Sequence, residues 1–459
     1  MPIRQKLMTN IYSARWILPV ASPAIENGAL AVEGSRIIGV GARDEVTTRF
    51  PEAPVRDFGE AAILPGLVNT HSHLELTAMR GYLEEGDFSA WLKKLTIARL
   101  ERMTPDDLYV AAAWGAVEAA RAGVTCLGDA SDAASSSMRA LSDVGLRGIV
   151  YQESFGPNPA EARDNFERLR EKVARLREDE SELVRVGVSP HAPYTVSAPQ
   201  LELITEFALE KKLPVMMHAA ESQAEELFMR EGTGPFAESL ARRGIEWRAP
   251  GISTIQYLAR HGVLSAQPLL AHCITVDEAD IETIRETGAS VAHCPKSNAK
   301  LSHGRAPFAA FISKDLKVGF GSDSVASNNT CDILEEARFA VLTARANAGE
   351  DWSKQQLSAE RALQVATMGG ARALGLQTQT GTLTENAQAD LAVVALNGAH
   401  QIPLHDPHAT LIFASSGRDV LMTMVAGSIV YNEGRVQTVD EDRLRARIKE
   451  IEKKVTGDK

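Results

Sequence analysis

Eight short apolar runs alternate with longer amphipathic stretches between residue 61 and about residue 370. The runs read AILPGLVN, VTCLGDA, RGIVYQES, VRVGVSP, PVMMHAA, LLAHC, SVAHCP and KVGFGSD. The stretches between them, such as 105–122 and 158–179, have the apolar spacing of helices with one solvated face. Strands that alternate with helices predict an α/β fold, here a (β/α)8 TIM-like barrel with its helices outside. Such a barrel needs about 250 residues, so the roughly 310 in this region leave room for insertions.

Strand-like segments of a different kind flank this region. Residues 1–58 contain WILPVA, GALAVEG and RIIGVGA, and short strands return after residue 375 in TGTLTEN, ADLAVVAL and VLMTMVAGSIVYNEGRV. We expect the barrel to span 59–375, with 1–58 and 376–459 joining into one small β-sandwich domain that ends in a charged helix over 441–454. Two independent extensions are the alternative, and they would leave more sheet edge exposed.

Composition excludes several classes of protein. The 459 residues are 44% hydrophobic and 24% charged, which indicates a folded globular chain. The net charge of −11 and the lack of a long Lys/Arg run argue against a nucleic-acid partner. No apolar run is long enough to span a membrane. The four cysteines form no C-x-x-C pair, which favours reduced thiols and a cytoplasmic location.

The first apolar run ends in two histidines, His71 and His73. In an extended chain, side chains at positions i and i+2 point to the same face, so these two imidazoles lie side by side. A pair of this kind can hold one metal ion. Two unrelated polar residues in a loop are the alternative, and the pair alone does not decide between them.

Later runs end in further residues of metal-binding or acid–base type: His191, His218, His272, His293 and Asp323. In a parallel barrel, functional residues collect at the carboxyl ends of the strands. Each one alone is an ordinary polar residue at a strand end, but the set indicates a site.

A zinc-like ion with an open position for water needs few nitrogen or oxygen ligands. Four of these side chains meet that need: His71, His73, His218 and Asp323. Glu221 follows His218 by three residues, so it can lie beside the ion without binding it. There it would shuttle protons.

The segments NTHSH, HAAE, AHC, VAHCPKSN and GSDSVASNN together resemble the amidohydrolase superfamily. The resemblance is to the branch of adenosine-type, guanine and S-adenosylhomocysteine deaminases and triazine chlorohydrolases, and it covers essentially the whole chain. The chain departs from the family at 385–387, where Glu-Asn-Ala replaces a common Pro-Gly-Lys; we expect a surface turn there, away from the site.

The resemblance implies one divalent ion, zinc or alternatively Fe²⁺, held by the four side chains above. It implies Glu221 as the proton shuttle and His272 as the residue that polarises the attacking water. Binuclear members carry a carboxylated lysine at the end of strand four. VGVSPHAPY, the corresponding segment here, has no lysine, so a single metal is expected.

The chemistry implied is hydrolytic deamination. The cation lowers the pKa of bound water from 15.7 toward about 7. His272 and Asp323 orient the resulting hydroxide for attack on a ring carbon that carries an amino group. Glu221 protonates the neighbouring ring nitrogen and then helps the amine leave as ammonia.

The expected substrate is a 6-aminopurine nucleoside. The residues from His71 to Glu75 resemble deaminases of 6-aminodeoxyfutalosine. Alternatives are deamination of S-adenosylhomocysteine or methylthioadenosine, deamination of guanine or another aminoheterocycle, dechlorination of a triazine, and a non-catalytic metal-binding scaffold. Loss of Glu221 or of a ligand would favour the scaffold, and all are present.

Three residues are expected to contact the substrate. The resemblance implies His191 near the base or ribose, and Trp91, in FSAWLKKL, near the sugar; Trp91 is alternatively an ordinary helix-core aromatic. Glu75 is placed to accept hydrogen bonds from sugar hydroxyls, unless it pairs with Arg80 and only shapes the loop. The oligomeric state stays open, with a homodimer as one alternative.

Overall fold

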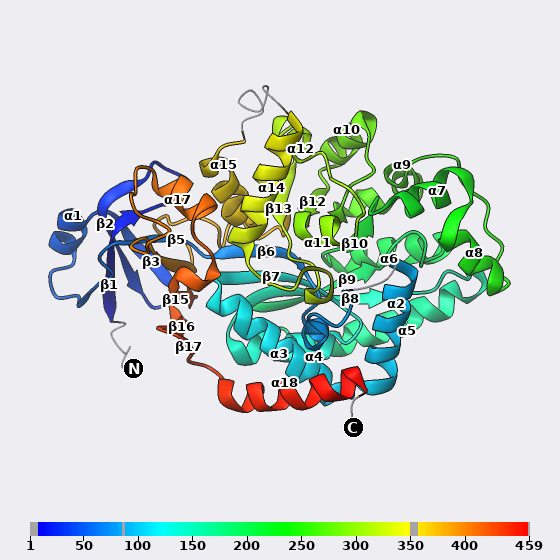
Figure 1. The fold of residues 1–459 in the computed structure, drawn as a ribbon, viewed down its shortest axis with the longest axis horizontal. Coiled ribbons are helices and arrows are strands. Elements are labelled where there is room, and N and C mark those ends of the chain that lie inside the picture. Colours follow the sequence, from blue (N-terminus) through cyan, green and yellow to red (C-terminus); the bar gives the residue numbers. More distant parts are fainter. Residues whose placement is uncertain (1–7, 85–87, 349–356, 458–459) are drawn as a thin grey trace.

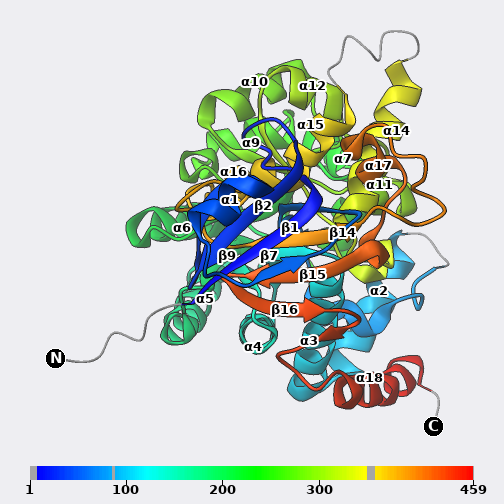
Figure 2. The ribbon, with the colours of Figure 1, turned by 90° about the vertical axis from the view of Figure 1, so that its left-hand side faces the viewer.

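The structure is a computed structural model that describes residues 8–84, 88–348 and 357–457. Both ends of the chain contribute to one nine-stranded sheet, which lies on the left in Figure 1 and faces the viewer in Figure 2. Its order is β17-β16-β15-β14-β5-β1-β2-β3, with β4 beside β1. The strands are β1 (Thr9–Ile17), β2 (Ile25–Glu33), β3 (Arg36–Ala42), β4 (Val55–Asp57), β5 (Ala61–Pro65), β14 (Leu391–Ala395), β15 (Val420–Val425), β16 (Ser428–Asn432) and β17 (Arg435–Val436).

The junction between the chain ends is the pairing of β5 with β14, which runs antiparallel from Pro65 opposite Leu391 to Ala61 opposite Ala395. The ends therefore join, as expected from the sequence. The strands of this unit are hydrogen-bonded into a single mixed sheet. The predicted strand TGTLTEN is wrong: this segment forms bends and a turn, with Asn386 at a φ of 71°.

The eight predicted parallel strands form two four-stranded sheets in sequence order. Isolated parallel bridges connect the sheets, from Ser72 to Asp323 at one side and from Val188 to Val215 at the other. These strands are almost wholly buried because helices cover them, which explains their continuous apolar runs. They are β6 (Leu67–Ser72), β7 (Val124–Ser131), β8 (Arg147–Ser154), β9 (Val184–Pro190), β10 (Met216–Ala219), β11 (Leu269–His272), β12 (Ser290–His293) and β13 (Lys317–Phe320).

The first apolar run does not form one strand, which corrects the sequence prediction. It breaks at Gly66, so that β5 enters the nine-stranded sheet and β6 enters the parallel set. Pro65 has no N–H for a ladder. A Cβ on Gly66 would lie 2.0 Å from Thr125 Oγ1, so only glycine lets the chain pass at this point.

Helices follow most of the parallel strands. They include α2 (Phe88–Ile97), α3 (Pro105–Arg121), α4 (Ala134–Val144), α5 (Ala162–Leu176), α6 (Ala198–Lys211), α7 (Gln223–Glu231), α10 (Glu278–Thr287), α11 (Pro295–Lys300), α12 (Phe308–Ser313), α13 (Val325–Asn328), α14 (Ile333–Ala348) and α18 (Glu441–Thr456). The helix predicted at 105–122 begins with a capping box between Thr104 and Asp107 and ends before Gly123, at a φ of 80°. No helix in the described ranges is long and apolar enough to cross a bilayer.

The terminal helix α18 lies along α3, at the bottom of Figure 1. Its Ile451 and Val455 are buried in a cluster that includes Leu76 and Met79 of the 3-10 helix η1 (Leu74–Met79). Lys454 Nζ donates to both oxygens of Asp107, each at 2.8 Å. The C-terminal helix thus supports the segment that follows His73.

Candidate active site

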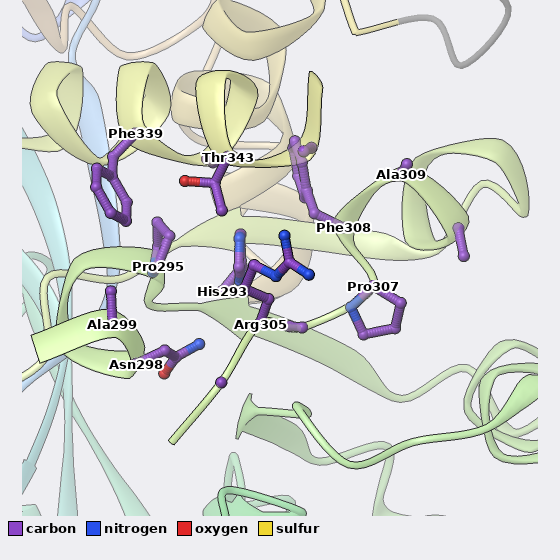
Figure 3. A pocket seen from close by; sticks show the side chains of 15 residues that line it. His293, Pro295, Asn298, Ala299, Arg305, Pro307, Phe308, Ala309, Phe339 and Thr343 are labelled. Carbon is purple, nitrogen blue, oxygen red and sulfur yellow. The ribbon is translucent and has the colours of Figure 1, made fainter. Parts of the chain in front are cut away.

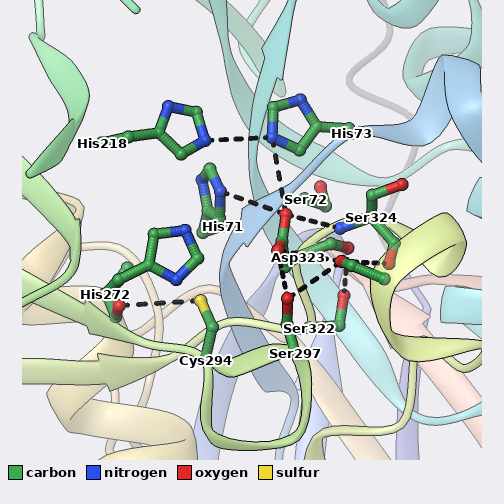
Figure 4. Close-up of polar contacts among 12 residues, drawn as sticks. His71, Ser72, His73, His218, His272, Cys294, Ser297, Ser322, Asp323 and Ser324 are labelled. Atoms are coloured by element: carbon green, nitrogen blue, oxygen red, sulfur yellow. Dashed lines mark hydrogen bonds and ion pairs between the residues drawn. The ribbon is translucent and has the colours of Figure 1, made fainter. Parts of the chain in front are cut away.

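Three histidines and one aspartate converge at the carboxyl ends of the parallel strands (Figure 4). His73 Nε2 lies 3.3 Å from His218 Nε2, and Asp323 Oδ1 lies 3.5 Å from Nε2 of both His71 and His73. Ligand atoms ~2.1 Å from a tetrahedral ion lie about 3.4 Å from one another. The spacing within this cluster therefore fits one small cation.

The outer nitrogens of two of the three histidines are already engaged. His218 Nδ1 lies 3.0 Å from the carbonyl oxygen of His191, and His71 Nδ1 lies 3.2 Å from Met216 Sδ. His71 Nε2 is buried and has no hydrogen-bond partner in the described part of the chain. Contacts of this kind fix the ring orientation and direct the remaining nitrogen toward a metal. Burial and the charge of His71 lower the pKa of His73 to about 3, so this ring is in its neutral, ligating form.

Asp323 is held from the opposite side. Its Oδ2 accepts hydrogen bonds from Ser297 Oγ at 2.5 Å and Ser327 Oγ at 3.0 Å, and its Oδ1 accepts one from Ser324 N at 2.7 Å. Burial acts to raise the pKa of Asp323, but the contact with His71 and the neighbouring positive charges outweigh it, so the pKa is well below its usual value. The group is therefore a carboxylate whose Oδ1 faces the histidines.

His272 lies beside the cluster, at the end of β11. Its Nδ1 donates to Asn298 Oδ1 at 2.8 Å, and its buried Nε2 has no hydrogen-bond partner in the described residues. This Nε2 is 3.7 Å from Glu221 Oε1. Sequence analysis missed Asn298 and Ser297 as supporting residues, although both belong to the VAHCPKSN segment that carried the resemblance.

Glu221 faces the cluster from the segment after β10. Tyr194 donates its hydroxyl to Oε2 at 3.2 Å, and His303 Nδ1 lies 3.5 Å from Oε1. Burial acts to raise the pKa of Glu221, but His272 and the other nearby histidines lower it below its usual value. Tyr194 follows the predicted His191 by three residues, whereas no local sequence signal indicates His303.

A pocket of about 430 Å³ opens above the cluster, and we call it the main pocket. The predicted site residues that line it are His73, Glu75, Trp91, His191, His218, Glu221 and Asp323. It extends from the metal-type cluster to α2, which carries Trp91. The structure thus brings the predicted substrate residues to the same cavity as the predicted ligands.

Glu75 is only 2% exposed, and its partner differs from the one considered in the sequence. Arg99 Nη2 lies 3.4 Å from Glu75 Oε1, whereas Arg80 pairs with Glu118. The alternative of an Arg80–Glu75 pair is therefore wrong. Burial raises the pKa of Glu75, and Arg99 opposes this shift. Glu75 Oε2 has no hydrogen-bond partner among the described residues.

Glu153 is a further pocket residue that sequence analysis did not select. It lies near the end of β8, and its carboxylate and ring nitrogens of His191 and His218 lie within 4.8 Å of one another. Burial and the charge of Glu75 raise its pKa well above the usual value. Its position in the YQES run gave no signal beyond that of a strand end.

His293 does not join the cluster. It lines a separate cavity of about 290 Å³, with Arg305 and Thr343 beside it (Figure 3). Its ring stacks on Phe308 at 5.0 Å between centroids, and burial lowers its pKa to about 3. His293 was selected from the sequence as a strand-end residue, but it lies in a different cavity from the metal-type cluster.

The chain is similar to known proteins along almost its whole length. A model described as the amidohydrolase family matches residues 62–430, and one described as an imidazolonepropionase-like composite domain of bacteria matches 28–53. The 5-methylthioadenosine/S-adenosylhomocysteine deaminase of Symbiobacterium thermophilum is 34% identical over 439 residues, covering 95% of this chain and 96% of that protein. The chain belongs to the amidohydrolase family. This confirms the resemblance seen in the sequence and the prediction of an amidohydrolase-type enzyme.

Solved structures show the same fold. An adenosine deaminase from Xanthomonas campestris with bound zinc has a TM-score of 0.87 at 28% identity, covering 98% of this chain and 99% of that one. The zinc complex of an atrazine chlorohydrolase from Arthrobacter aurescens has a TM-score of 0.83 at 21% identity, covering 96% and 99%. The aminofutalosine deaminase of Helicobacter pylori, in complex with methylthio-coformycin, has a TM-score of 0.77 at 21% identity, covering 92% and 100%. The last two likenesses concern the fold alone.

Proposed function

We propose that this amidohydrolase is a hydrolytic deaminase of adenosine-type nucleosides, of the methylthioadenosine and S-adenosylhomocysteine kind. The observation that carries the proposal is the position of Glu221, which faces the cluster of His71, His73, His218 and Asp323 without belonging to it. Similarity to deaminases of this name over nearly the whole chain supports the substrate class.

The four clustered side chains would hold one divalent cation, and we propose zinc, with Fe²⁺ as the alternative. When bound, such a cation lowers the pKa of water and supplies a nucleophile at neutral pH. His272 Nε2 and Asp323 Oδ1 are placed to hold and orient that water. Glu221, a carboxylate, would take the proton that the attacking water loses and pass it to the ring nitrogen beside the reacting carbon. It would then carry the second proton of that oxygen to the amine, which leaves as ammonia.

The remaining expectations are part of the same proposal. His191, Trp91 and Glu75 bind the nucleoside, and the region predicted at 59–375, without β5 that enters the nine-stranded sheet, forms the closed barrel that carries the catalysis. The enzyme acts in the cytoplasm, with a homodimer as one alternative assembly. The 6-aminodeoxyfutalosine and triazine alternatives are supported by similarity of fold, at 21% sequence identity. The methylthioadenosine and S-adenosylhomocysteine class has likeness of sequence as well, so we place it first.

The decisive measurement is a release assay over adenosine, methylthioadenosine, S-adenosylhomocysteine, aminodeoxyfutalosine, guanine, cytosine and a chlorotriazine. We expect ammonia from the adenosine derivatives at the highest kcat/KM. Glu221→Gln should lower kcat by about 10²–10⁴-fold and retain the metal, because an amide cannot shuttle the proton. Chloride release that exceeds ammonia release, or full turnover by Glu221→Gln, would contradict the proposal.

Metal analysis tests the ligand set independently of turnover. Wild type should contain one equivalent of metal per chain, and His71→Ala and Asp323→Ala should contain far less. Two equivalents per chain, or full activity after chelation, would show that a single-ion site is wrong.

A further inference from the structure

Three large apolar side chains are unusually exposed at the mouth of the main pocket. Leu92 of α2 is 40% exposed, Leu100 of the π-helix η2 (Ala98–Arg102) is 65% exposed, and Phe155, directly after β8, is 41% exposed. All three line the pocket, together with Leu95. Exposed apolar side chains that gather at one place indicate a surface that a ligand covers.

The same pocket offers no unpaired cation among its described lining residues. Arg99 is its one basic side chain of the Lys/Arg type, and it is already engaged. Its Nη2 lies 3.1 Å from Asp132 Oδ2 and 3.4 Å from Glu75 Oε1. A substrate carboxylate at the mouth would have to compete with two protein carboxylates for this one guanidinium.

Acidic side chains also line the main pocket. Glu75, Asp132 and Glu153 all line it, and Lys172, which lies outside the pocket lining, is bound to Asp132 at 2.9 Å. A substrate carboxylate brought into this pocket would lose its hydration, and the two nearby cations, Arg99 and Lys172, are already paired with protein carboxylates. An uncharged apolar substituent gives up little hydration and needs no cation as a partner.

The direction of the substrate follows from the proposed function, on which this inference rests. With the reacting base over the cluster and the sugar near Glu75 and His191, the 5′ substituent would extend toward α2, whose Leu92 and Leu95 line the same pocket. We infer that Leu92, Leu95, Leu100 and Phe155 form a subsite for an uncharged, apolar 5′ substituent such as an alkylthio group. This subsite discriminates against a substituent ending in a carboxylate, so within the proposed substrate class it favours methylthioadenosine over S-adenosylhomocysteine.

A matched pair of substrates tests this inference. One is 5′-butylthio-5′-deoxyadenosine, and the other is its analogue with a carboxylate at the end of a side chain of similar length. We expect kcat/KM to rise from methylthio to butylthio, by up to about fourfold for each methylene that is buried. We expect the carboxylate analogue to be at least tenfold poorer than the butylthio compound, mainly through KM.

A charge introduced at the mouth should reverse part of this preference. Leu92→Arg should raise kcat/KM for the carboxylate analogue and lower it for the butylthio compound. Leu209→Arg is the matched control, because Leu209 is 49% exposed on α6 and lies outside the pocket lining. Calorimetric binding of both compounds to Glu221→Gln gives the same comparison without turnover.

The outcomes separate this inference from the function on which it rests. Ammonia release with equal kcat/KM for the two matched compounds would overturn the apolar subsite and leave the deaminase intact. Absence of ammonia release from every nucleoside would overturn the deaminase, and the binding comparison would still decide the preference of the subsite. An equal effect of Leu92→Arg and Leu209→Arg would also overturn the subsite.

Discussion

Asn298 determines which nitrogen of His272 faces the cluster. When His272 is neutral, the bond from its Nδ1 to Asn298 Oδ1 makes Nε2 the nitrogen without a proton, which can accept one from water. In the described part of the chain Asn298 makes no hydrogen bond with a proposed metal ligand, so we assign it a positioning role.

Asn298→Ala should lower kcat by about 10–100-fold, the usual cost of losing such an orienting partner, while the metal content stays at that of wild type. Asn298→Asp keeps the acceptor oxygen and should recover part of the loss, with a shifted pH profile for kcat. Metal analysis and kcat across pH provide the check. If Asn298→Ala lost its metal, the residue would be part of the metal site and not of the base.

Among the site residues, the sequence predicted those whose position depends on local spacing or on a strand end. It missed those that reach the site from distant segments of the chain. The i, i+2 spacing of His71 and His73 is local, and the positions of His218 and Asp323 follow from the strand-end rule. Asn298 and His303 reach the site from segments after other strands, so their roles become visible only once the strands are placed side by side. The partner of Glu75 was missed for the same reason.

Helix α14 meets the start of α11 through a buried carboxyl, Glu336. Asn328 Nδ2 donates to its Oε1 at 2.6 Å, and Lys296 N donates to its Oε2 at 3.2 Å. Burial raises the pKa of Glu336 from the usual 4.5 to about 8, against the opposing charge of Lys296. The folded protein therefore keeps a proton here that the unfolded chain releases above about pH 4.5.

The free energy of unfolding should thus fall as pH rises from about 4.5 to 8, by at most about 1.4 kcal/mol per pH unit from this group. Glu336→Gln removes this titrating group. Its melting temperature should therefore rise relative to that of wild type as the pH is raised from 5 to 8. Glu335→Gln is the control, because the neighbouring Lys296 lowers the pKa of Glu335 in spite of partial burial, which raises it. If the difference in melting temperature between Glu336→Gln and wild type stayed the same from pH 5 to 8, this account would be wrong.

Helix α18 connects stability to the pocket, since Ile451 is fully buried against the cluster that contains Leu76. Leu76 also lines the main pocket. Ile451→Ala should cost about 2–5 kcal/mol of stability and raise KM, because the wall after His73 loses its support. Thermal melting and steady-state kinetics measure the two effects, with Glu452→Ala on the exposed side as control. A lower melting temperature with unchanged KM would limit α18 to a structural role.

The boundaries of the helices and strands show which features can be predicted from local sequence and which cannot. The start of α3 could be placed because Thr104, Pro105 and Asp107 form a local cap. The division of the first apolar run into β5 and β6 could not, because the reason for Gly66 is a contact with Thr125 on another strand. The order of the nine-stranded sheet likewise depends on pairing between the two ends of the chain.

Across the whole molecule, the parallel strands and the nine-stranded sheet are joined by a buried ion pair. Arg147 Nε at the start of β8 donates to Asp390 Oδ2 at 2.7 Å, and the two side chains are 4% and 0% exposed. Ala426 N donates to the other oxygen of Asp390 at 2.7 Å. The two layers are therefore joined by a charge pair as well as by apolar packing.

Arg147→Met should cost about 3–5 kcal/mol, because it leaves Asp390 buried without a counter-charge. The double variant Arg147→Met/Asp390→Asn should be more stable than Arg147→Met alone, since no unpaired charge remains. Urea midpoints of wild type, Arg147→Met, Asp390→Asn and the double variant provide the measurement. Additive losses in the double variant would show that the two side chains act independently.

The position of β5 inside the nine-stranded sheet has a consequence for the nascent chain during translation. On the ribosome, the β5 edge emerges early, but its partner β14 is made about 330 residues later, roughly 20–60 s at ordinary elongation rates. For that interval an apolar strand edge stays open to pairing with other nascent chains. A message cut short before β14 therefore yields a product that aggregates, even when all the parallel strands have been translated.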